Sequence, residues 1–126
     1  MIINPERVRR IHGSFSFIPH RFLTDGFLSS LTQQEILVYI FLVLVSDRYG
    51  LSYYAYDSIC SSLQLAIDDY IEARDGLIDK DLIACNGTLF QVLDLPEKAA
   101  DQPFRKAQHS TIAQLIRKSI KEDNND

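Results

Sequence analysis

The side chains that could carry chemistry are few, and none has the spacing of a catalytic or metal-binding motif. His12, His20 and His109 lie on segments predicted to be flexible, and Cys60 and Cys85 lack metal-ligand spacing. The sequence has no glycine-rich phosphate loop. We therefore predict no enzyme, no cofactor and no metal site, and we interpret both cysteines as reduced thiols.

Other side chains have the chemistry to contact nucleic acid. Gln64 and Arg74 can read base edges or bind phosphate, and the alternative for Arg74 is a solvated side chain paired with an acid one turn away. Four tyrosines in the middle of the chain can stack on the bases of a single strand or pack between a strand and a helix. They are Tyr49, Tyr53, Tyr54 and Tyr56.

The net charge of −4 is unevenly distributed. Residues 1–21 carry four arginines against one glutamate (+3), residues 22–97 three bases against twelve acids (−9), and residues 98–126 six bases against four acids (+2). The basic ends can bind a nucleic-acid backbone; they can also be solvated extensions, or partners for the acidic middle of a second subunit. Their basic residues include Arg7, Arg9, Arg10 and Arg21, and Arg105, Lys106, Arg117, Lys118 and Lys121.

The segment 66–80 is acidic, with five acids against Arg74 and Lys80. Asp68, Asp69 and Glu72 could collect a cation, and the alternative is a solvated acidic surface. Acids near a helix N-terminus stabilise the helix through its dipole. In a DNA groove, however, several carboxylates beside one arginine repel phosphate.

The elements that position these side chains lie between residues 56 and 93. The pattern predicts a helix over Tyr56–Leu63, a turn at Gln64-Leu65, and a second helix from about Ala66 to Lys80. Two β-rich runs, 82–85 and 88–93, follow on either side of Asn86-Gly87, which is typical of a type I′ hairpin turn. Isoleucines and leucines at helical spacing are expected to face the preceding helix; they are Ile59, Leu63, Ile67, Ile71 and Ile78.

The preceding helix is expected from Thr32 to about Arg48. Thr32 and Glu35 form a capping-box pattern, and Gly50 is placed at the left-handed stop position. Because this helix is apolar almost all the way round, every side of it must be covered. Part of it must meet the N-terminal arm, the C-terminal helix or a second copy of the chain, which indicates an extended core or a dimer. We predict a homodimer, with interface residues Tyr39 and Val43 here and Ile112, Leu115 and Ile116 in a C-terminal helix.

Between Phe17 and Leu93 the chain resembles the N-terminal winged-helix domains of bacterial replication initiators and DnaD-like primosomal proteins. The resemblance is carried by residues 17–19 (FIP), 31–35 (LTQQE), 50–53 (GLSY) and 77–83 (LIDKDLI). It implies that the second helix of the pair enters the major groove and that the wing, with Asn86, touches the DNA backbone or minor groove. Asp81 stands where the family has glycine, and aspartate tolerates that left-handed conformation.

The expected fold is mainly α with a small β wing, a winged helix-turn-helix. Its parts are a basic arm (1–21), the winged-helix domain (22–95), a linker (96–103), a C-terminal helix (104–121) and a disordered tail (122–126). The charged N-terminus lacks the pattern of an export signal, and the longest apolar run is half of a membrane span; a bacterial-type cytoplasmic protein is expected.

Two functions remain open at this stage. One is DNA binding in regulation or replication, of a plasmid or mobile-element type among others, through Gln64, Arg74, Asn86, Arg7, Arg9, Arg10, Arg117 and Lys118. The other is protein–protein assembly through the acidic second helix of the pair, without DNA.

Overall fold

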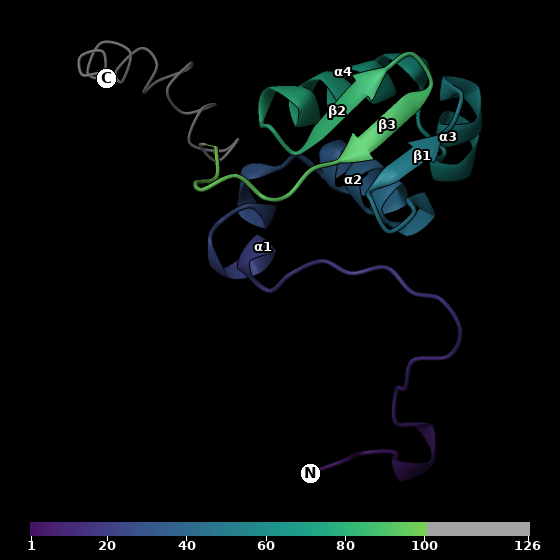
Figure 1. The fold of residues 1–126 in the computed structure, drawn as a ribbon, viewed down its shortest axis with the longest axis vertical. Helices are drawn as coiled ribbons and strands as arrows, with labels where there is room; N and C mark the ends of the chain where they lie inside the picture. The colour runs from purple at the N-terminus through teal and green to yellow at the C-terminus, as the bar shows by residue number, and fades with distance from the viewer. Residues whose placement is uncertain (101–126) are drawn as a thin grey trace, which may run out of the picture.

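The computed structural model describes residues 1–100 (Figure 1). In chain order the elements are η1 (Pro5–Arg7), α1 (Arg21–Thr24), η2 (Leu28–Ser30), α2 (Gln33–Val45), β1 (Leu51–Tyr53), α3 (Tyr56–Leu63), α4 (Ile67–Asp79), β2 (Ile83–Asn86) and β3 (Leu89–Val92). The expected class, mainly helical with a small sheet, is confirmed. The predicted C-terminal helix at 104–121 and the tail at 122–126 lie outside the described residues.

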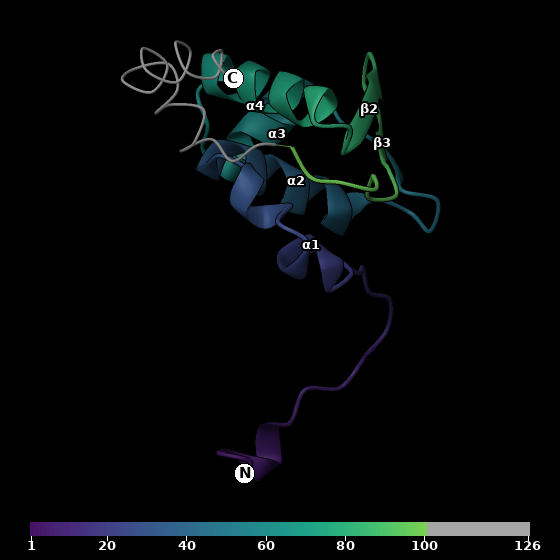
Figure 2. The same ribbon diagram turned by 90° about the vertical axis from the view of Figure 1, so that its left-hand side faces the viewer.

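The sheet has three antiparallel strands in the order β1-β3-β2, so β3 lies in the middle. Ser52 in β1 and Cys85 in β2 both pair with Phe90 in β3. Figure 2 shows α4, α3 and α2 stacked above α1, with the β2–β3 hairpin standing at one end of the stack. Strand β1 thus adds a third strand to the hairpin, on the β3 side.

The hydrophobic core lies between α2, α3, α4 and the inner face of the sheet. Each element contributes side chains at its own period: three to four residues along the helices and two along the strands. From the helices these are Val38, Tyr39, Leu42, Val43, Ile59, Tyr70, Ala73 and Leu77, and from the sheet side Leu82, Ile83 and Phe90. Phe22, Phe27 and Leu31, which precede α2, complete the cluster.

The N-terminus of α2 is joined to α4 by a buried ion pair. Thr32 Oγ1 accepts from the Glu35 amide at 3.2 Å, and Glu35 Oε1 accepts from the Thr32 amide at 3.0 Å, so the capping box is confirmed. The same Oε1 accepts from Lys80 Nζ at 2.6 Å, and Nζ also donates to the Ser30 carbonyl at 2.7 Å. The two side chains are only 7% and 13% exposed, and Gly76 leaves the space that the carboxylate occupies.

The α3–α4 pair matches the sequence prediction closely. α3 ends at Leu63, and Gln64 turns the chain with a left-handed φ of 56°. Ala66 is the N-cap of α4. After α4, Asp81 adopts the left-handed conformation with φ 65°, so this position keeps the geometry expected of glycine.

The hairpin turn differs from the prediction by one position. Asn86 is the last residue of β2 and pairs with Leu89, so Gly87 and Thr88 are the central residues. Gly87 has φ 66°, whereas neither Asn86 nor Thr88 has a positive φ. This is the φ pattern of a type II′ turn, in which only the first central residue must be left-handed. The prediction of a type I′ turn centred on Asn86 was therefore wrong.

Helix α2 is shorter than expected, because it ends at Val45 with Ser46 as its C-cap. The Asp47 carboxylate accepts from the amides of Tyr49 (2.8 Å) and Leu51 (3.0 Å), which organises a turn in place of a further helical turn. Gly50 does have a positive φ, 83°, but it belongs to this turn: its amide donates to the Asp47 carbonyl and its carbonyl accepts from Val92.

Residues 1–17 form an arm: its first part runs away from the helices (Figure 1), and its last part, 14–17, lies beside α2, where Ser16 Oγ donates to the Leu44 carbonyl at 3.5 Å. All of its side chains are exposed, including the apolar ones of Ile3, Val8, Ile11 and Phe15. Apart from the 3-10 turn η1 it contains no regular element, so residues 15–18 form an extended segment and not a strand. Figures 1 and 2 both place the N-terminus at the opposite end of the molecule from α4.

Candidate interaction surfaces

Helix α4 has a narrow buried face. Tyr70, Ala73 and Leu77 point into the core, at the spacing of one helical face. Asp68 and Asp69 lie in the first turn, where their charge is favourable to the helix dipole. Gly76 and Arg74 are half-buried, and the other residues of α4 are exposed.

The exposed surface of α4 carries two adjacent rows of side chains, which we call the α4 face. One row is apolar: Ile67, Ile71 and Ile78 are 43%, 38% and 38% exposed. The other row is acidic and follows the same helical spacing, with Asp68, Glu72, Asp75 and Asp79, all exposed. The prediction that Ile67, Ile71 and Ile78 face α2 was wrong, because Tyr70, Ala73 and Leu77 occupy that side.

Arg74 lies beside this face and is already engaged. Its Nε and Nη2 donate to Asp75 Oδ1 at 3.1 and 3.0 Å, and its guanidinium carbon lies 5.8 Å from the centre of the Tyr70 ring. The hydrogen bond to Asp75 raises the pKa of Arg74. Arg74 therefore resembles the paired arginine of the alternative interpretation, although its acid is the next residue and not one turn away.

The residues predicted to contact DNA do not form one surface within residues 1–100. Gln64 lies in the α3–α4 turn, exposed, and Asn86 at the tip of the hairpin. Arg7, Arg9 and Arg10 lie on the arm, at the other end of the molecule from α4 (Figures 1 and 2). Arg117 and Lys118 lie outside the described residues.

The predicted dimer residues of α2 are buried within the chain. Tyr39 is 2% exposed and Val43 6%, so neither can contact a second copy, and this prediction was wrong. The Phe22 ring of α1 stacks on Tyr39 with centroids 5.0 Å apart, and burial raises the pKa of Tyr39. The sequence suggested an uncovered side of α2, which α1 covers. Leu37 and Leu44 are exposed on α2 instead; Ile112, Leu115 and Ile116 lie outside the described residues.

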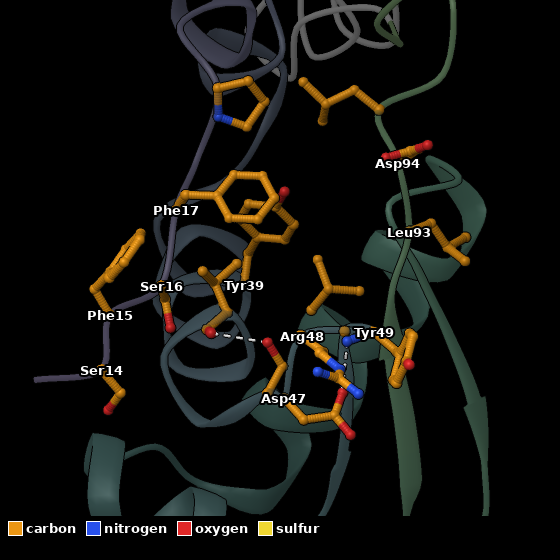
Figure 3. A pocket seen from close by; sticks show the side chains of 16 residues that line it. Ser14, Phe15, Ser16, Phe17, Tyr39, Asp47, Arg48, Tyr49, Leu93 and Asp94 are labelled. Carbon is orange, nitrogen blue, oxygen red and sulfur yellow. Dashed lines mark hydrogen bonds between the residues drawn. The ribbon is translucent and has the colours of Figure 1, made fainter.

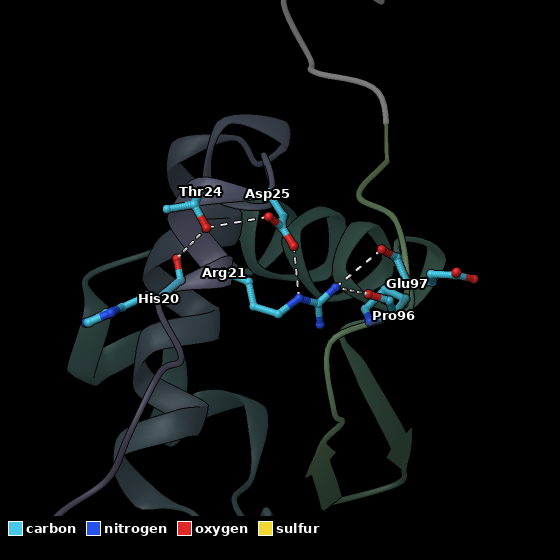
Figure 4. A network of polar contacts seen from close by, with 6 residues as sticks. All are labelled: His20, Arg21, Thr24, Asp25, Pro96 and Glu97. Carbon is cyan, nitrogen blue, oxygen red and sulfur yellow. Dashed lines mark hydrogen bonds and ion pairs between the residues drawn. The ribbon is translucent and has the colours of Figure 1, made fainter.

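Arg21, the first residue of α1, has a structural role (Figure 4). Its Nε pairs with Asp25 at 3.0 Å, and its Nη2 donates to the carbonyls of Pro96 (2.9 Å) and Glu97 (3.3 Å). The guanidinium also lies over the Phe27 ring. Arg21 thus ties α1 to the segment that follows β3, and its Nε and Nη2 donate inside the molecule.

A cavity of about 550 Å³ lies between the base of the arm, the end of α2 and the segment after β3 (Figure 3). Phe15 and Phe17 line it on the arm side, Tyr39 and Val43 on the helix side, and Leu93 to Leu95 opposite. No motif of the sequence pointed to it, because its walls come from three distant segments. Its lining is mainly apolar, and the Asp47 carboxylate on its edge is bound to backbone amides.

The four tyrosines considered for base stacking are dispersed. Tyr49, Tyr53 and Tyr56 are exposed, and the Arg48 guanidinium lies over the Tyr49 ring. Tyr54 packs edge-on against Phe41 of α2 with centroids 5.3 Å apart. Tyr54 therefore has the packing role of the alternative interpretation.

Within residues 1–100 no group of His, Cys, Asp and Glu side chains is arranged to hold a metal ion. Burial and the nearby Asp57 carboxylate raise the pKa of the Cys60 thiol, so its nucleophilic thiolate is disfavoured. In the same part of the chain, no helix has the length and apolar character needed to cross a membrane. Comparisons with protein-family models, curated proteins and solved structures find no match to this chain.

Proposed function

We propose that this chain is a winged helix-turn-helix module whose α4 face binds another protein. The winged-helix assignment is supported by the order of the elements: helix α2, strand β1, helices α3 and α4, then the hairpin β2–β3. The sheet order β1-β3-β2 supports it as well, because β1 pairs with the free edge of the β2–β3 hairpin, along β3.

The composition of the α4 face is the observation that carries the protein-binding function. In a winged helix that reads DNA, this helix approaches phosphates that must be neutralised by lysine and arginine. Here its outer row is acidic, and its arginine is paired with Asp75. The adjacent row of exposed isoleucines offers no hydrogen bonds to base edges, but it can supply the apolar centre of a protein interface.

The partner that fits this face is apolar and basic. Isoleucine side chains gain by burial against other apolar groups. The neighbouring carboxylates favour lysine or arginine at the rim, where opposite charges steer association and set its orientation.

A titration with DNA tests this proposal against the alternative function. We expect no change in the fluorescence anisotropy of a short generic duplex at low salt, up to tens of micromolar protein, where non-specific DNA binders respond. Binding of the duplex that is lost in Arg74→Ala, but kept in the matched control Arg48→Ala, would overturn the proposal, because it would place α4 on DNA.

DNA binding in regulation or replication is the second candidate, and the arm favours it. Arg7, Arg9 and Arg10 are exposed and make no ion pair within residues 1–100. In this function the arm and the hairpin tip at Asn86 would contact the DNA backbone, and α4 would not enter the major groove. Duplex binding lost in a triple alanine variant of the arm, and unchanged in Arg74→Ala, would support it.

A further inference from the structure

We infer that the partner of the α4 face is the N-terminal arm of a second copy of this chain. The inference rests on the proposed function, since it names the occupant of the same surface. It also gives a role to the arm, whose exposed arginines make no ion pair within residues 1–100.

The arm and the α4 face are complementary in chemistry. The segment 7–11 (RVRRI) combines three arginines with Val8 and Ile11, all exposed. The α4 face combines an apolar row with an acidic row, in which Asp68, Glu72 and Asp79 make no ion pair within residues 1–100. Apolar contact and charge pairing can therefore form together along one helix.

The length of the arm segment also agrees with the length of α4. Helix α4 has 13 residues and is therefore about 20 Å long. An extended segment advances about 3.3 Å per residue, so six or seven residues of the arm span the helix. The segment 5–11 carries all three arginines and one glutamate, Glu6. It spans about 19 Å, with the 3-10 turn η1 over residues 5–7 at about 2.0 Å per residue and residues 8–11 at the extended rise.

The position of the arm favours a second copy over its own domain. The arm leaves from the side of α1, and α4 lies at the far side of the helical stack (Figures 1 and 2). The arm of one molecule therefore points away from its own α4 face, which leaves it free to reach the α4 face of a second copy. This contact joins two different surfaces, so it links copies head to tail, either in a closed ring or in a growing chain.

A charge-swap experiment tests this contact in the full chain by sedimentation at low salt. The arm variant is R7E/R9E/R10E, and the face variant is D68K/E72K/D79K, which leaves the Arg74–Asp75 pair intact. The matched control D57K/D94K/E97K makes the same change in charge on exposed carboxylates outside α4.

We expect the wild type and the control to associate with rising concentration, and to dissociate in high salt as the charges are screened. Each swapped variant alone has like charges on both surfaces and should remain a monomer. An equimolar mixture of the two variants should associate again, because each arm then meets a face of opposite charge; a misfolded variant could not do this.

A wild type that stays monomeric at all concentrations overturns the inference, and so does a mixture that fails to associate. Either result leaves the proposed function standing if the duplex titration is negative, since the α4 face can then bind a different protein. Arg74-dependent duplex binding overturns the proposed function itself, so the two failures are distinguishable.

Discussion

Gly76→Ala should destabilise this protein, although alanine is the better helix former. Gly76 lies in the second half of α4, and Glu35 from α2 occupies the place that a Cβ would take. A Cβ at this position would lie 2.9 Å from Glu35 Cδ and closer still to Oε2, so the carboxylate must move. That carboxylate accepts from both Lys80 Nζ and the Thr32 amide through Oε1, so moving it strains or breaks both contacts.

The magnitude follows from two opposing effects. Alanine in place of glycine in a helix interior gains about 1 kcal/mol. Separating a buried ion pair while its charges stay buried costs about 3–5 kcal/mol, and the Glu35 and Lys80 side chains are 7% and 13% exposed. We therefore expect a net loss of about 2–4 kcal/mol in the free energy of unfolding.

The effect of Gly76→Ala on stability should change sign when the Glu35–Lys80 ion pair is absent. In the background Glu35→Ala/Lys80→Met no carboxylate meets the new Cβ, and no charge is left unpaired. Gly76→Ala should then stabilise the protein by about 0.5–1 kcal/mol, the helix preference alone. The background also provides the matched control, because the substitution in α4 is identical.

Urea denaturation followed by far-ultraviolet circular dichroism measures both effects. The midpoint should fall in the single variant and rise in the background, with the slope unchanged. Stabilisation by Gly76→Ala in the wild-type sequence would refute the reasoning, since it would mean that Glu35 does not occupy this space.

Two further predictions concern a pair of glycines and a tyrosine. Gly50→Ala should lower the free energy of unfolding by about 3 kcal/mol, because φ is +83° and a Cβ would overlap the Val92 carbonyl. Gly87→Ala should lower it by only about 1 kcal/mol, because φ is +66° but the space around a Cβ is open. Equal losses in urea denaturation would contradict this comparison. Burial raises the pKa of Tyr39 above its ordinary value of 10.0. The unfolded chain therefore loses this proton first, and stability should fall as pH rises above about 10; Tyr39→Phe should make that decline shallower in thermal melts, and an unchanged decline would count against the assignment.

Much of the fold could be predicted from the sequence because the signals are local. The capping box at Thr32 and Glu35, the α3–α4 turn at Gln64 and the left-handed residue at Asp81 each depend on backbone geometry within a few residues. The hairpin was located by Asn86-Gly87, but its turn was misplaced by one position. Strand register there depends on which face of β2 is buried, and this is decided by the helices beneath it.

The sequence predicted that α4 carries a candidate surface, but it did not predict which side chains of α4 are exposed. Tyr70, Ala73 and Leu77 have the same helical spacing as Ile67, Ile71 and Ile78, so periodicity alone does not say which set is inside. In the structure Gly76 leaves room for Glu35 of α2 to pair with Lys80, the first set is buried, and the isoleucines are exposed. The burial of Tyr39 could not be predicted either, because Tyr39 is covered by Phe22, which comes from another segment of the chain.

The sequence by itself determined where the described helices and strands lie between Thr32 and Val92, with small shifts at their ends, because caps, left-handed residues and hydrophobic periods act within one or two turns of chain. Only the tertiary structure decided which side of each helix is buried. Burial depends on the neighbours that arrive from distant segments, and these neighbours separate the apolar residues of the core from those left on the α4 face.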